Sequence, residues 1–223
     1  MQTEITLSPS SLNLMIECPR CFWEQMKEGI KRPSSPFPSL PNGMDKILKV
    51  YFDRYRFKGE LPPELKIEAD LEDFKLLKDQ KTLDEWRNCF KGIKYKDKDS
   101  GITLKGAVDE LLVDKNGKVA VLDFKTRGYP PKPDSVDYYK LQLNLYVYLL
   151  KENGLDTLDF GFLLFYYPDE LRQRTKFKFK YDLAEVKVSP KEGERAFRKA
   201  INILEGDKPN LSSDCEFCRW RNT

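Results

Sequence analysis

The spacing of apolar residues changes character about halfway along the chain. In the first half, apolar residues recur at three- and four-residue steps, which predicts helices over residues 8–27, 43–57 and 82–90. The clearest stripe lies in the second of these helices and consists of Met44, Ile47, Leu48, Tyr51, Phe52 and Tyr55. Between the first two helices, residues 31–42 carry four prolines and three serines, which predicts an irregular connection.

From Gly92 onward the pattern favours strands. A continuous apolar run, residues 119–122, is typical of a strand buried on both faces, and Asp114-Lys115-Asn116-Gly117 supplies a hairpin turn before it. An apolar helix ending at Gly154 follows. The remaining predicted elements are strands over 93–95, 102–113, 158–167 and 172–181, the apolar helix over 136–153 and a last helix over 190–204. This order predicts one α/β domain with a mixed central sheet flanked by helices.

Composition narrows the chemistry. The 223 residues suffice for one sizeable core, and 39 basic against 36 acidic residues give a net charge of only +3, which says little about partners. The chain contains no histidine, which excludes Ser-His-Asp and Cys-His nucleophiles and every His-ligated metal. No apolar run approaches the roughly 18 residues that cross a bilayer. The first residues lack a secretory signal pattern, so we expect a cytoplasmic protein without a membrane partner.

Two short fragments bring acidic residues and a lysine together. Asp123-Phe124-Lys125 ends the buried strand, where alternation points Asp123 and Lys125 to the same face. Gly106-Ala107-Val108-Asp109 is expected inside the preceding strand, and the hairpin sets Asp109 beside Asp123. Such a group suits phosphodiester hydrolysis, with Asp109 and Asp123 as ligands of Mg²⁺ or Mn²⁺ and Lys125 positioning water and offsetting charge.

The alternative is that these residues are ordinary solvated ends of strands. A lone D-x-K occurs by chance in any highly charged chain. Its position after an uninterrupted apolar strand, one hairpin beyond G-x-x-D, favours the functional interpretation instead.

A third fragment indicates a family. Gln142 and Tyr146 lie four residues apart, on one face of the next helix. G-x-x-D, D-x-K-T and Q-x-x-x-Y, in that order over residues 104–149, resemble the RecB-like branch of the PD-(D/E)XK nucleases, which includes CRISPR-associated exonucleases. The resemblance implies a restriction-endonuclease-like fold and metal-dependent cleavage of DNA. It also implies that Gln142 and Tyr146 position substrate or catalytic groups, the alternative being that the tyrosine only packs.

The same resemblance implies a further metal ligand on an early helix. In this chain the matching segment is Gly43-Met44-Asp45-Lys46-Ile47-Leu48, where Asp45 stands in place of the histidine of the CRISPR-associated relatives. An aspartate that merely stabilises the start of a helix is the structural alternative.

Two C-x-x-C pairs stand near opposite ends of the chain, and a fifth cysteine, Cys89, is expected to be a small core residue. Such pairs favour metal binding over disulfides, and four thiolates suit either zinc or a [4Fe–4S] cluster. The resemblance implies the iron–sulfur cluster. However, those relatives typically use one N-terminal and three C-terminal cysteines, so the two-and-two division here keeps zinc as an alternative, and unligated thiols as a third. The ligands would be Cys18, Cys21, Cys215 and Cys218.

Such a centre would join the two ends of one domain. In that arrangement residues 1–30 and 205–223 form the cysteine region of a single nuclease domain, 1–223, around a catalytic core over 43–190. The metal would act as a structural staple.

Basic residues alternate along one predicted strand: Arg172, Arg174, Lys176, Lys178 and Lys180. A basic face of this kind suits a phosphate backbone, but a solvated edge strand explains it slightly better. Secondary candidates for DNA contact, with ordinary surface charge as the alternative, are Arg195, Arg198, Lys199, Arg219 and Arg221.

The expected function is therefore a DNA nuclease, and the resemblance favours an exonuclease on DNA ends or single strands in repair, recombination or CRISPR adaptation. One alternative is a non-catalytic nucleic-acid-binding module. Another is a nuclease subunit that is active only with a helicase partner or with CRISPR adaptation proteins.

Overall fold

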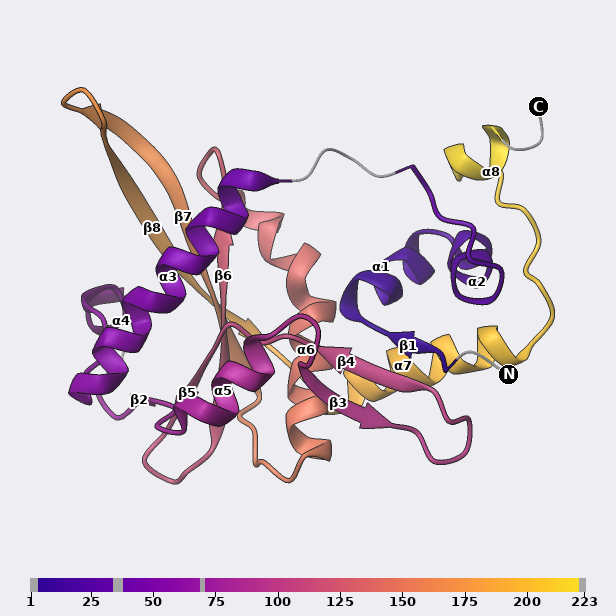
Figure 1. Ribbon diagram of the computed structural model, residues 1–223, viewed down its shortest axis with the longest axis horizontal. Coiled ribbons are helices and arrows are strands. Elements are labelled where there is room, and N and C mark those ends of the chain that lie inside the picture. The colour runs from indigo at the N-terminus through magenta and orange to yellow at the C-terminus, as the bar shows by residue number, and fades with distance from the viewer. Residues whose placement is uncertain (1–3, 34–37, 69–70, 221–223) are drawn as a thin grey trace.

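Two mixed β-sheets organise the computed structural model, which describes residues 4–33, 38–68 and 71–220 (Figure 1). The small sheet has the strand order β1-β4-β3, and the large sheet has the order β2-β5-β6-β7-β8. Their strands are β1 (Thr6–Leu7), β2 (Lys75–Leu76), β3 (Ile93–Lys96), β4 (Thr103–Gly106), β5 (Glu110–Val113), β6 (Val119–Thr126), β7 (Phe160–Arg172) and β8 (Lys176–Lys187).

Helices cover both faces of the large sheet, and one of them also packs against the small sheet. They are α1 (Pro9–Glu17), α2 (Pro19–Lys27), α3 (Ser39–Lys58), α4 (Pro63–Glu68), α5 (Gln80–Arg87), α6 (Asp137–Glu152), α7 (Pro190–Glu205) and α8 (Glu216–Trp220), with a 3₁₀ turn, η1 (Pro133–Val136), before α6. In the described part of the chain, no helix is both long and apolar enough to cross a membrane.

The mixed α/β character is confirmed, but the expected single central sheet is not. The predicted strand over 102–113 divides into β4 and β5, which belong to different sheets. Asp109 therefore lies in the connection between two strands and not inside one. Apolar residues continue through this connection, since Leu104, Val108 and Leu111 all join the same core cluster. The apolar pattern alone thus carries no signal that the strand changes partners.

The predicted helix over 8–27 is also divided. Cys18 is extended between α1 and α2, with φ −159° and ψ 104°. Pro19, the first residue of α2, is the physical reason, because proline disfavours the helical conformation in the residue before it.

The other long elements follow the prediction closely. Helix α3 starts four residues earlier than expected, at Ser39, and ends at Gly59 with φ +70°. Of the predicted irregular connection over 31–42, residues 34–37 lie outside the described residues. The hairpin before β6, the buried strand itself, α6 and α7 are confirmed.

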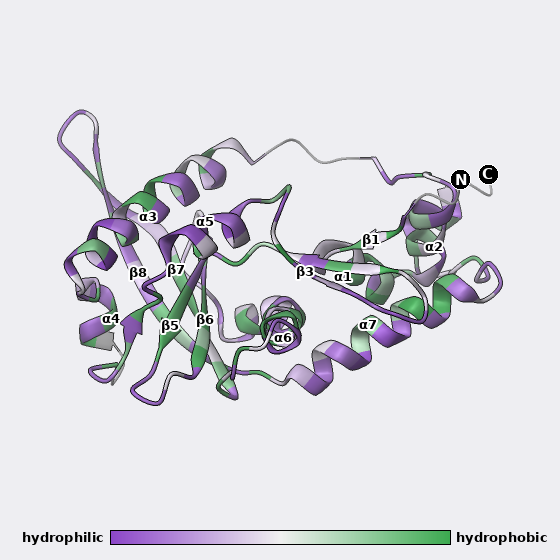
Figure 2. Ribbon diagram, turned by 60° about the horizontal axis from the view of Figure 1, so that its bottom comes forward, coloured by the Kyte–Doolittle hydropathy of each residue, from purple (hydrophilic) through white to green (hydrophobic). Residues whose placement is uncertain are grey.

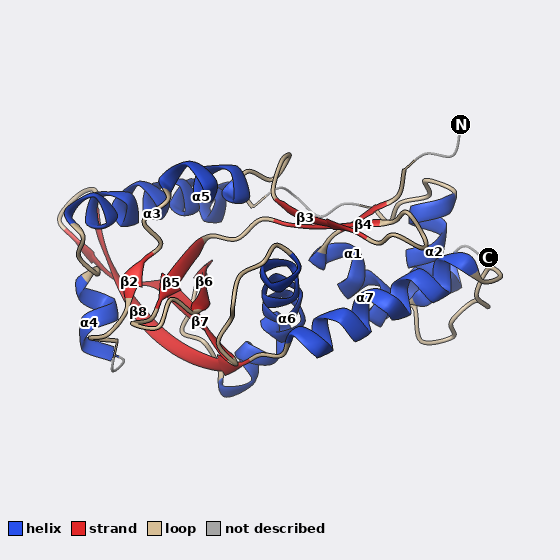
Figure 3. Ribbon diagram, turned by 90° about the horizontal axis from the view of Figure 1, so that it is seen from below, coloured by secondary structure: helices blue, strands red, loops and turns tan. Residues whose placement is uncertain are grey.

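Strand β6 separates two hydrophobic clusters. On one face, Leu122 and Phe124 pack under α3, where the rings of Phe52 and Phe124 lie 4.6 Å apart. On the other face, Val121 packs in a cluster with α6, and Figure 3 shows α3 and α6 on opposite sides of the large sheet. Helix α6 is buried nearly all round from Leu143 to Leu150, and Figure 2 shows green, hydrophobic residues along its ribbon among purple ones.

The β7–β8 hairpin extends well beyond the rest of the large sheet (Figure 1). Its turn, residues 173–175, falls inside the strand predicted over 172–181. The five alternating basic residues are therefore distributed around a hairpin tip and do not follow one continuous strand.

Candidate functional site

The end of β6 carries the two residues on which the predicted site depends. Asp123 and Lys125 face α6, as alternation requires, and form an ion pair with each other. Asp123 is only 1% exposed. Burial raises the pKa of its carboxyl to about 7, with Lys125 opposing the shift and the charge of Asp109 adding to it.

Lys125 is held as an ammonium group. Burial disfavours its charge, but attraction to Asp123 and Asp109 outweighs this effect and raises its pKa. Its Nζ also lies 4.4 Å from the centre of the Tyr139 ring. A lysine that stays protonated can neutralise negative charge but cannot act as a base.

Asp109 reaches β6 from the connection between the two sheets. Its Oδ2 accepts a hydrogen bond of 3.0 Å from the backbone N–H of Phe124, which places the carboxylate alongside Asp123. The structure therefore brings together the two acidic residues and the lysine that the sequence motif predicted.

Gln142 and Tyr146 complete this group from α6. Gln142 Nε2 donates to Asp123 Oδ1 at 3.2 Å and to the Tyr146 hydroxyl at 2.7 Å, while its Oε1 accepts from Lys125 Nζ at 3.1 Å. The amide thereby fixes the orientation of both partners of the ion pair. Tyr146 is buried, which raises the pKa of its hydroxyl well above the usual value.

The glycine of G-x-x-D has a packing role. A Cβ at Gly106 would lie 2.8 Å from Tyr146 Cε1 and 2.9 Å from Leu149 Cδ1. The glycine therefore allows β4 to approach α6 closely. The tyrosine both packs against the strand and contacts the polar group, so the two interpretations of Tyr146 are compatible.

Asp45 is linked to this group through the side chain of Lys49. It accepts a hydrogen bond of 2.8 Å from Lys49 Nζ, and the same ammonium lies 3.0 Å from Asp109 Oδ1. Among the described residues, only the four cysteines form a group of three or more acidic or thiol side chains close enough to share an ion. Asp45, Asp109 and Asp123 thus do not close around one point, and a ligand role for Asp45 stays a prediction.

Lys49 is a site residue that the motif analysis missed. Attraction to Asp109 and Asp45 overcomes the opposing effect of burial and raises its pKa. The available signal was its position one helical turn after Asp45, an aspartate–lysine pair at the i,i+4 spacing.

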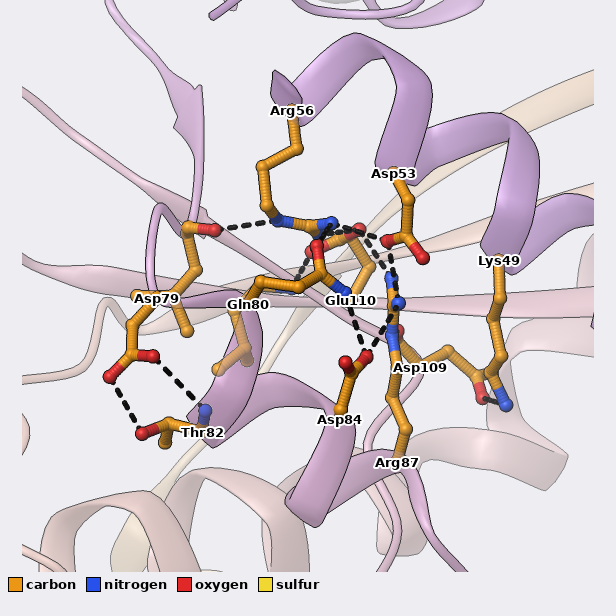
Figure 4. A network of polar contacts seen from close by, with 12 residues as sticks. Lys49, Asp53, Arg56, Asp79, Gln80, Thr82, Asp84, Arg87, Asp109 and Glu110 are labelled. Atoms are coloured by element: carbon orange, nitrogen blue, oxygen red, sulfur yellow. Dashed lines mark hydrogen bonds and ion pairs between the residues drawn. The ribbon is translucent and has the colours of Figure 1, made fainter.

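A buried charge network supports Asp109 from the other side (Figure 4). Arg87 Nε donates to the Asp109 carbonyl at 2.7 Å, and Arg87 Nη2 donates to Glu110 Oε2 at 2.9 Å. Arg56 Nη2 donates to both oxygens of the same Glu110 carboxylate, which is fully buried. Helices α3 and α5 therefore clamp the connection that carries Asp109.

Comparison with known families decides the assignment. Residues 35–223 match the model of the PD-(D/E)XK nuclease superfamily. The chain belongs to this superfamily. Membership in the PD-(D/E)XK superfamily implies a hydrolytic nuclease, and its members use divalent metal ions.

Other comparisons add little. No curated protein matches the chain. A solved structure described as "Crystal structure of SSO0001" aligns with 100% of this chain and 86% of its own, at 16% identity and a TM-score of 0.42. A similarity this weak adds nothing to the PD-(D/E)XK assignment.

The residues fit the divalent ion of the superfamily. Asp109 and Asp123 offer the hard carboxylate oxygens that Mg²⁺ and Mn²⁺ prefer. Asp123 Oδ2 is buried, and the Lys125 ammonium lies against it as an ion-pair partner. Two adjacent carboxylates, each balanced here by a lysine ammonium, are suitable ligands for a divalent cation.

The four predicted cysteine ligands gather at the other end of the molecule, where α2 lies beside α8. All four are buried, and their sulfur atoms lie within 4.8 Å of one another. The expectation for Cys89 was wrong, because that side chain is exposed. It follows α5 directly and lies outside the hydrophobic clusters.

Several of the other basic residues proposed to contact DNA form ion pairs within the protein. Arg195 pairs with Glu192 at 2.7 Å, and Arg198 pairs with Asp97, so both have structural partners. In the hairpin, Asp169 pairs with Lys178 at 3.1 Å and with Lys180 at 2.8 Å. Arg221 lies outside the described residues.

Proposed function

We propose that this protein is a divalent-metal-dependent DNA nuclease that acts as an exonuclease on DNA ends or single strands. The observation that supports this most strongly is the convergence of Asp109, Asp123 and Lys125 at the end of β6, with Gln142 bonded to two of them.

Each side chain has a distinct role in this proposal. Asp109 and Asp123 hold Mg²⁺ or Mn²⁺, which when bound lowers the pKa of water and polarises a phosphate. Lys125, held protonated, offsets the charge that develops on the phosphate and orients the attacking water. Gln142 fixes the positions of the Asp123 carboxylate and the Lys125 ammonium by a hydrogen bond to each. Tyr146 in turn accepts a hydrogen bond from Gln142 and holds its amide in place.

The β7–β8 hairpin supports a nucleic acid as the substrate. Strand β6 runs parallel to β7 and its pairing ends at Thr126, opposite Tyr166, so β7 continues past the site by six residues. At about 3.3 Å per residue this reaches roughly 20 Å, the length of several nucleotides. The tip exposes Arg172, Arg174 and Lys176.

The hairpin tip also offers apolar surface beside these charges. Leu171 and Phe177 are paired across the two strands and are 60% and 63% exposed. Basic residues next to an exposed aromatic ring suit single strands, because phosphates bind the charges and bases stack on the ring. This combination favours a binding role for the tip over that of a purely solvated edge.

The four-cysteine centre is proposed to be structural. Four thiolates leave no open position for a substrate or water, and the centre joins α2 to the C-terminal segment. Loss of the metal from this centre is therefore expected to lower the stability of the fold and to affect cleavage only as a consequence.

A cleavage assay tests the proposal. The purified chain is incubated with Mg²⁺, Mn²⁺ or EDTA and with end-labelled single-stranded, blunt and flapped DNA, the same sequences in RNA, and a closed circular strand. We expect nucleotides released from linear DNA only with metal, and an intact circle. The Asp109→Asn variant is expected to be inactive and Asp99→Asn, an exposed aspartate in the β3–β4 turn, to be normal.

The outcomes separate the alternatives. Cutting of the circle would replace the exonuclease with an endonuclease. DNA binding without cleavage under every metal condition would favour the non-catalytic module. Activity that appears only after a helicase is added would favour the dependent subunit.

A further inference from the structure

The two C-x-x-C pairs adopt the same local turn. Cys18 immediately precedes α2 and Cys215 immediately precedes α8, so the second cysteine of each pair is the third residue of its helix. In both turns the first sulfur accepts a hydrogen bond from the backbone N–H of the second cysteine. The first carbonyl also accepts from the residue four positions on, at 3.1 Å in the first turn and 3.0 Å in the second.

These matched turns face each other at short range. Sγ of Cys18 lies 3.6 Å from Sγ of Cys218, and Sγ of Cys21 lies 3.7 Å from that of Cys215 and 3.9 Å from that of Cys218. All the sulfurs lie within 4.8 Å of one another. The four donor atoms therefore form one small, compact group.

The size of this group distinguishes the two metal centres. A zinc ion binds four thiolates at about 2.3 Å, which puts the sulfurs about 3.8 Å apart on the edges of a tetrahedron. A [4Fe–4S] cluster binds each thiolate to a different iron at the corners of a cube, which spreads the sulfurs to roughly 6 Å. Three sulfur pairs lie 3.6 to 3.9 Å apart and all pairs lie within 4.8 Å, so the separations are closer to those around a single ion than to those around the cluster.

We infer that Cys18, Cys21, Cys215 and Cys218 bind one tetrahedral Zn²⁺ and not an iron–sulfur cluster. The two-and-two division of the ligands is consistent with this, because two equivalent turns present four equivalent thiolates to one point. This inference does not rest on the proposed nuclease function, since it concerns a separate group of residues.

The surroundings suit the charge of this centre. Four thiolates around Zn²⁺ carry a net charge of about −2. Arg32 Nη2 donates to Cys215 Sγ at 3.4 Å, and its guanidinium lies 4.6 Å from the centre of the Phe217 ring. One cation is thus fixed directly against the thiolates and partly offsets their charge.

The zinc would hold the C-terminal segment against the first helices. Between α7 and α8, Lys208 also attaches that segment, since it pairs with Glu28 at 2.8 Å and with Glu24 at 3.4 Å and lies 5.5 Å from the centre of the Trp23 ring. The Pro209 carbonyl accepts a hydrogen bond of 2.8 Å from Arg20. These are contacts of a few side chains, whereas ion binding by both turns couples metal affinity to the folding of α8.

Metal analysis of the full chain is the decisive test. The protein is expressed with both zinc and iron in the medium and purified with and without air. We expect about one zinc per chain, negligible iron and no visible colour in both preparations. Iron at two or more atoms per chain with visible absorption, or a chain free of metal, would overturn the inference.

Matched variants locate the ion. Cys218→Ser is expected to lose the zinc, whereas Cys89→Ser, which changes the exposed cysteine outside the group, is expected to keep it. Zinc retained in full by Cys218→Ser would contradict the assignment.

Two measurements on the unaltered protein stand even if that variant fails to fold. X-ray absorption at the zinc edge is expected to show four sulfur neighbours at about 2.3 Å, and nitrogen or oxygen neighbours instead would contradict the site. Removing zinc with a chelator is expected to speed hydrogen exchange over residues 206–220, and added Zn²⁺ to reverse the change. An unchanged rate of hydrogen exchange would contradict the proposal that zinc holds this segment against the first helices.

Discussion

Positively charged side chains lie on more than one side of the Asp109 carboxylate. The Lys49 ammonium lies 3.0 Å from its Oδ1, and Lys125 raises the local positive charge from β6. Lys49 offsets the carboxylates of Asp45 and Asp109 with a single positive charge, where a divalent ion would supply two. The lysine and the metal therefore compete for Asp109.

This competition makes a prediction. The Lys49→Met variant is expected to bind Mn²⁺ several-fold more tightly, because the ion no longer displaces an ammonium from Asp109. Isothermal titration measures the affinity. Lys46→Met, an exposed lysine of the same helix, is the control and should bind as the unaltered chain does. Weaker or unchanged binding in Lys49→Met would show that the lysine does not occupy the metal's place.

At the residue scale, the sequence predicts those contacts that a short local motif determines. Alternation along β6 is enough to place Asp123 beside Lys125, and helical spacing is enough to place Gln142 beside Tyr146. The meeting of Lys49 with Asp109 is not predictable in this way, because it depends on how α3 packs across the sheet. For the same reason, the predicted ligand role of Asp45 depends on an arrangement that the sequence does not specify.

Among the elements, α3 and α5 act together through Glu110. Its buried carboxylate accepts from both Arg56 and Arg87, whose side chains are 4% and 6% exposed. Neutralising it leaves two buried guanidinium groups with only Asp53 as a shared acidic partner. Removing one partner of a buried ion pair is costly because the remaining charge is left uncompensated.

We therefore expect Glu110→Gln to lower the free energy of unfolding by roughly 3 kcal/mol. It should also reduce cleavage, since Arg87 holds the Asp109 carbonyl. Urea denaturation measures the first effect. Glu85→Gln, an exposed residue of α5, should change stability by no more than about 0.5 kcal/mol. A similar decrease in the free energy of unfolding in both variants would contradict the stabilising role assigned to Glu110.

The projecting hairpin carries a second prediction at this scale. Replacing Arg174 and Lys176 together with glutamine is expected to weaken single-stranded DNA binding and to reduce its salt dependence by roughly one to two units of slope. Fluorescence anisotropy over a range of salt concentrations measures both. The control is Lys98→Gln with Lys191→Gln, two exposed lysines of other elements, and an equal loss there would mean that the effect is only one of net charge.

The sequence predicts elements better than it predicts the partners of those elements. Helices α3, α6 and α7 follow from apolar stripes, and β6 follows from a continuous apolar run. The division of 102–113 between two sheets does not follow, because both strands are mostly buried and buried apolar residues continue through the connection between them. The turn at 173–175 was missed because it contains charged and polar residues that also alternate along a strand.

Across the whole molecule, one ion pair ties the small sheet to α7. Asp97, in the turn between β3 and β4, accepts hydrogen bonds from the Ser100 backbone at 3.0 Å and from its hydroxyl at 2.8 Å, and it pairs with Arg198. Burial opposes the charged form, but these hydrogen bonds and the guanidinium outweigh it and lower the pKa of Asp97 below 3.8.

A pH dependence of stability follows from that shift. Because the folded pKa is depressed, the contribution of Asp97 is fully present at neutral pH and is lost as the pH falls below about 3.8. Asp97→Asn should therefore be less stable by about 1 kcal/mol at pH 7 and approach the unaltered chain as the pH falls through the lowered folded pKa of Asp97. Urea denaturation at a series of pH values measures the difference, and a gap that widens toward acid would contradict the sign.

The carboxylate–lysine group and the four-cysteine group lie at opposite ends of the molecule. The carboxylate–lysine group lies at the end with the large sheet, and the four thiolates lie at the end where α2 meets α8. The sequence predicted both groups, because each rests on short motifs. It did not predict the spacing of the sulfur atoms, which required the packing of two segments nearly 200 residues apart.

The most direct test of the central claim is the single-turnover rate of DNA cleavage by Asp123→Asn at saturating Mn²⁺, compared with the unaltered chain. We predict a loss of about a hundredfold or more, because the neutral amide cannot hold the ion or partner Lys125. A rate equal to that of the unaltered chain would contradict the assignment of the site.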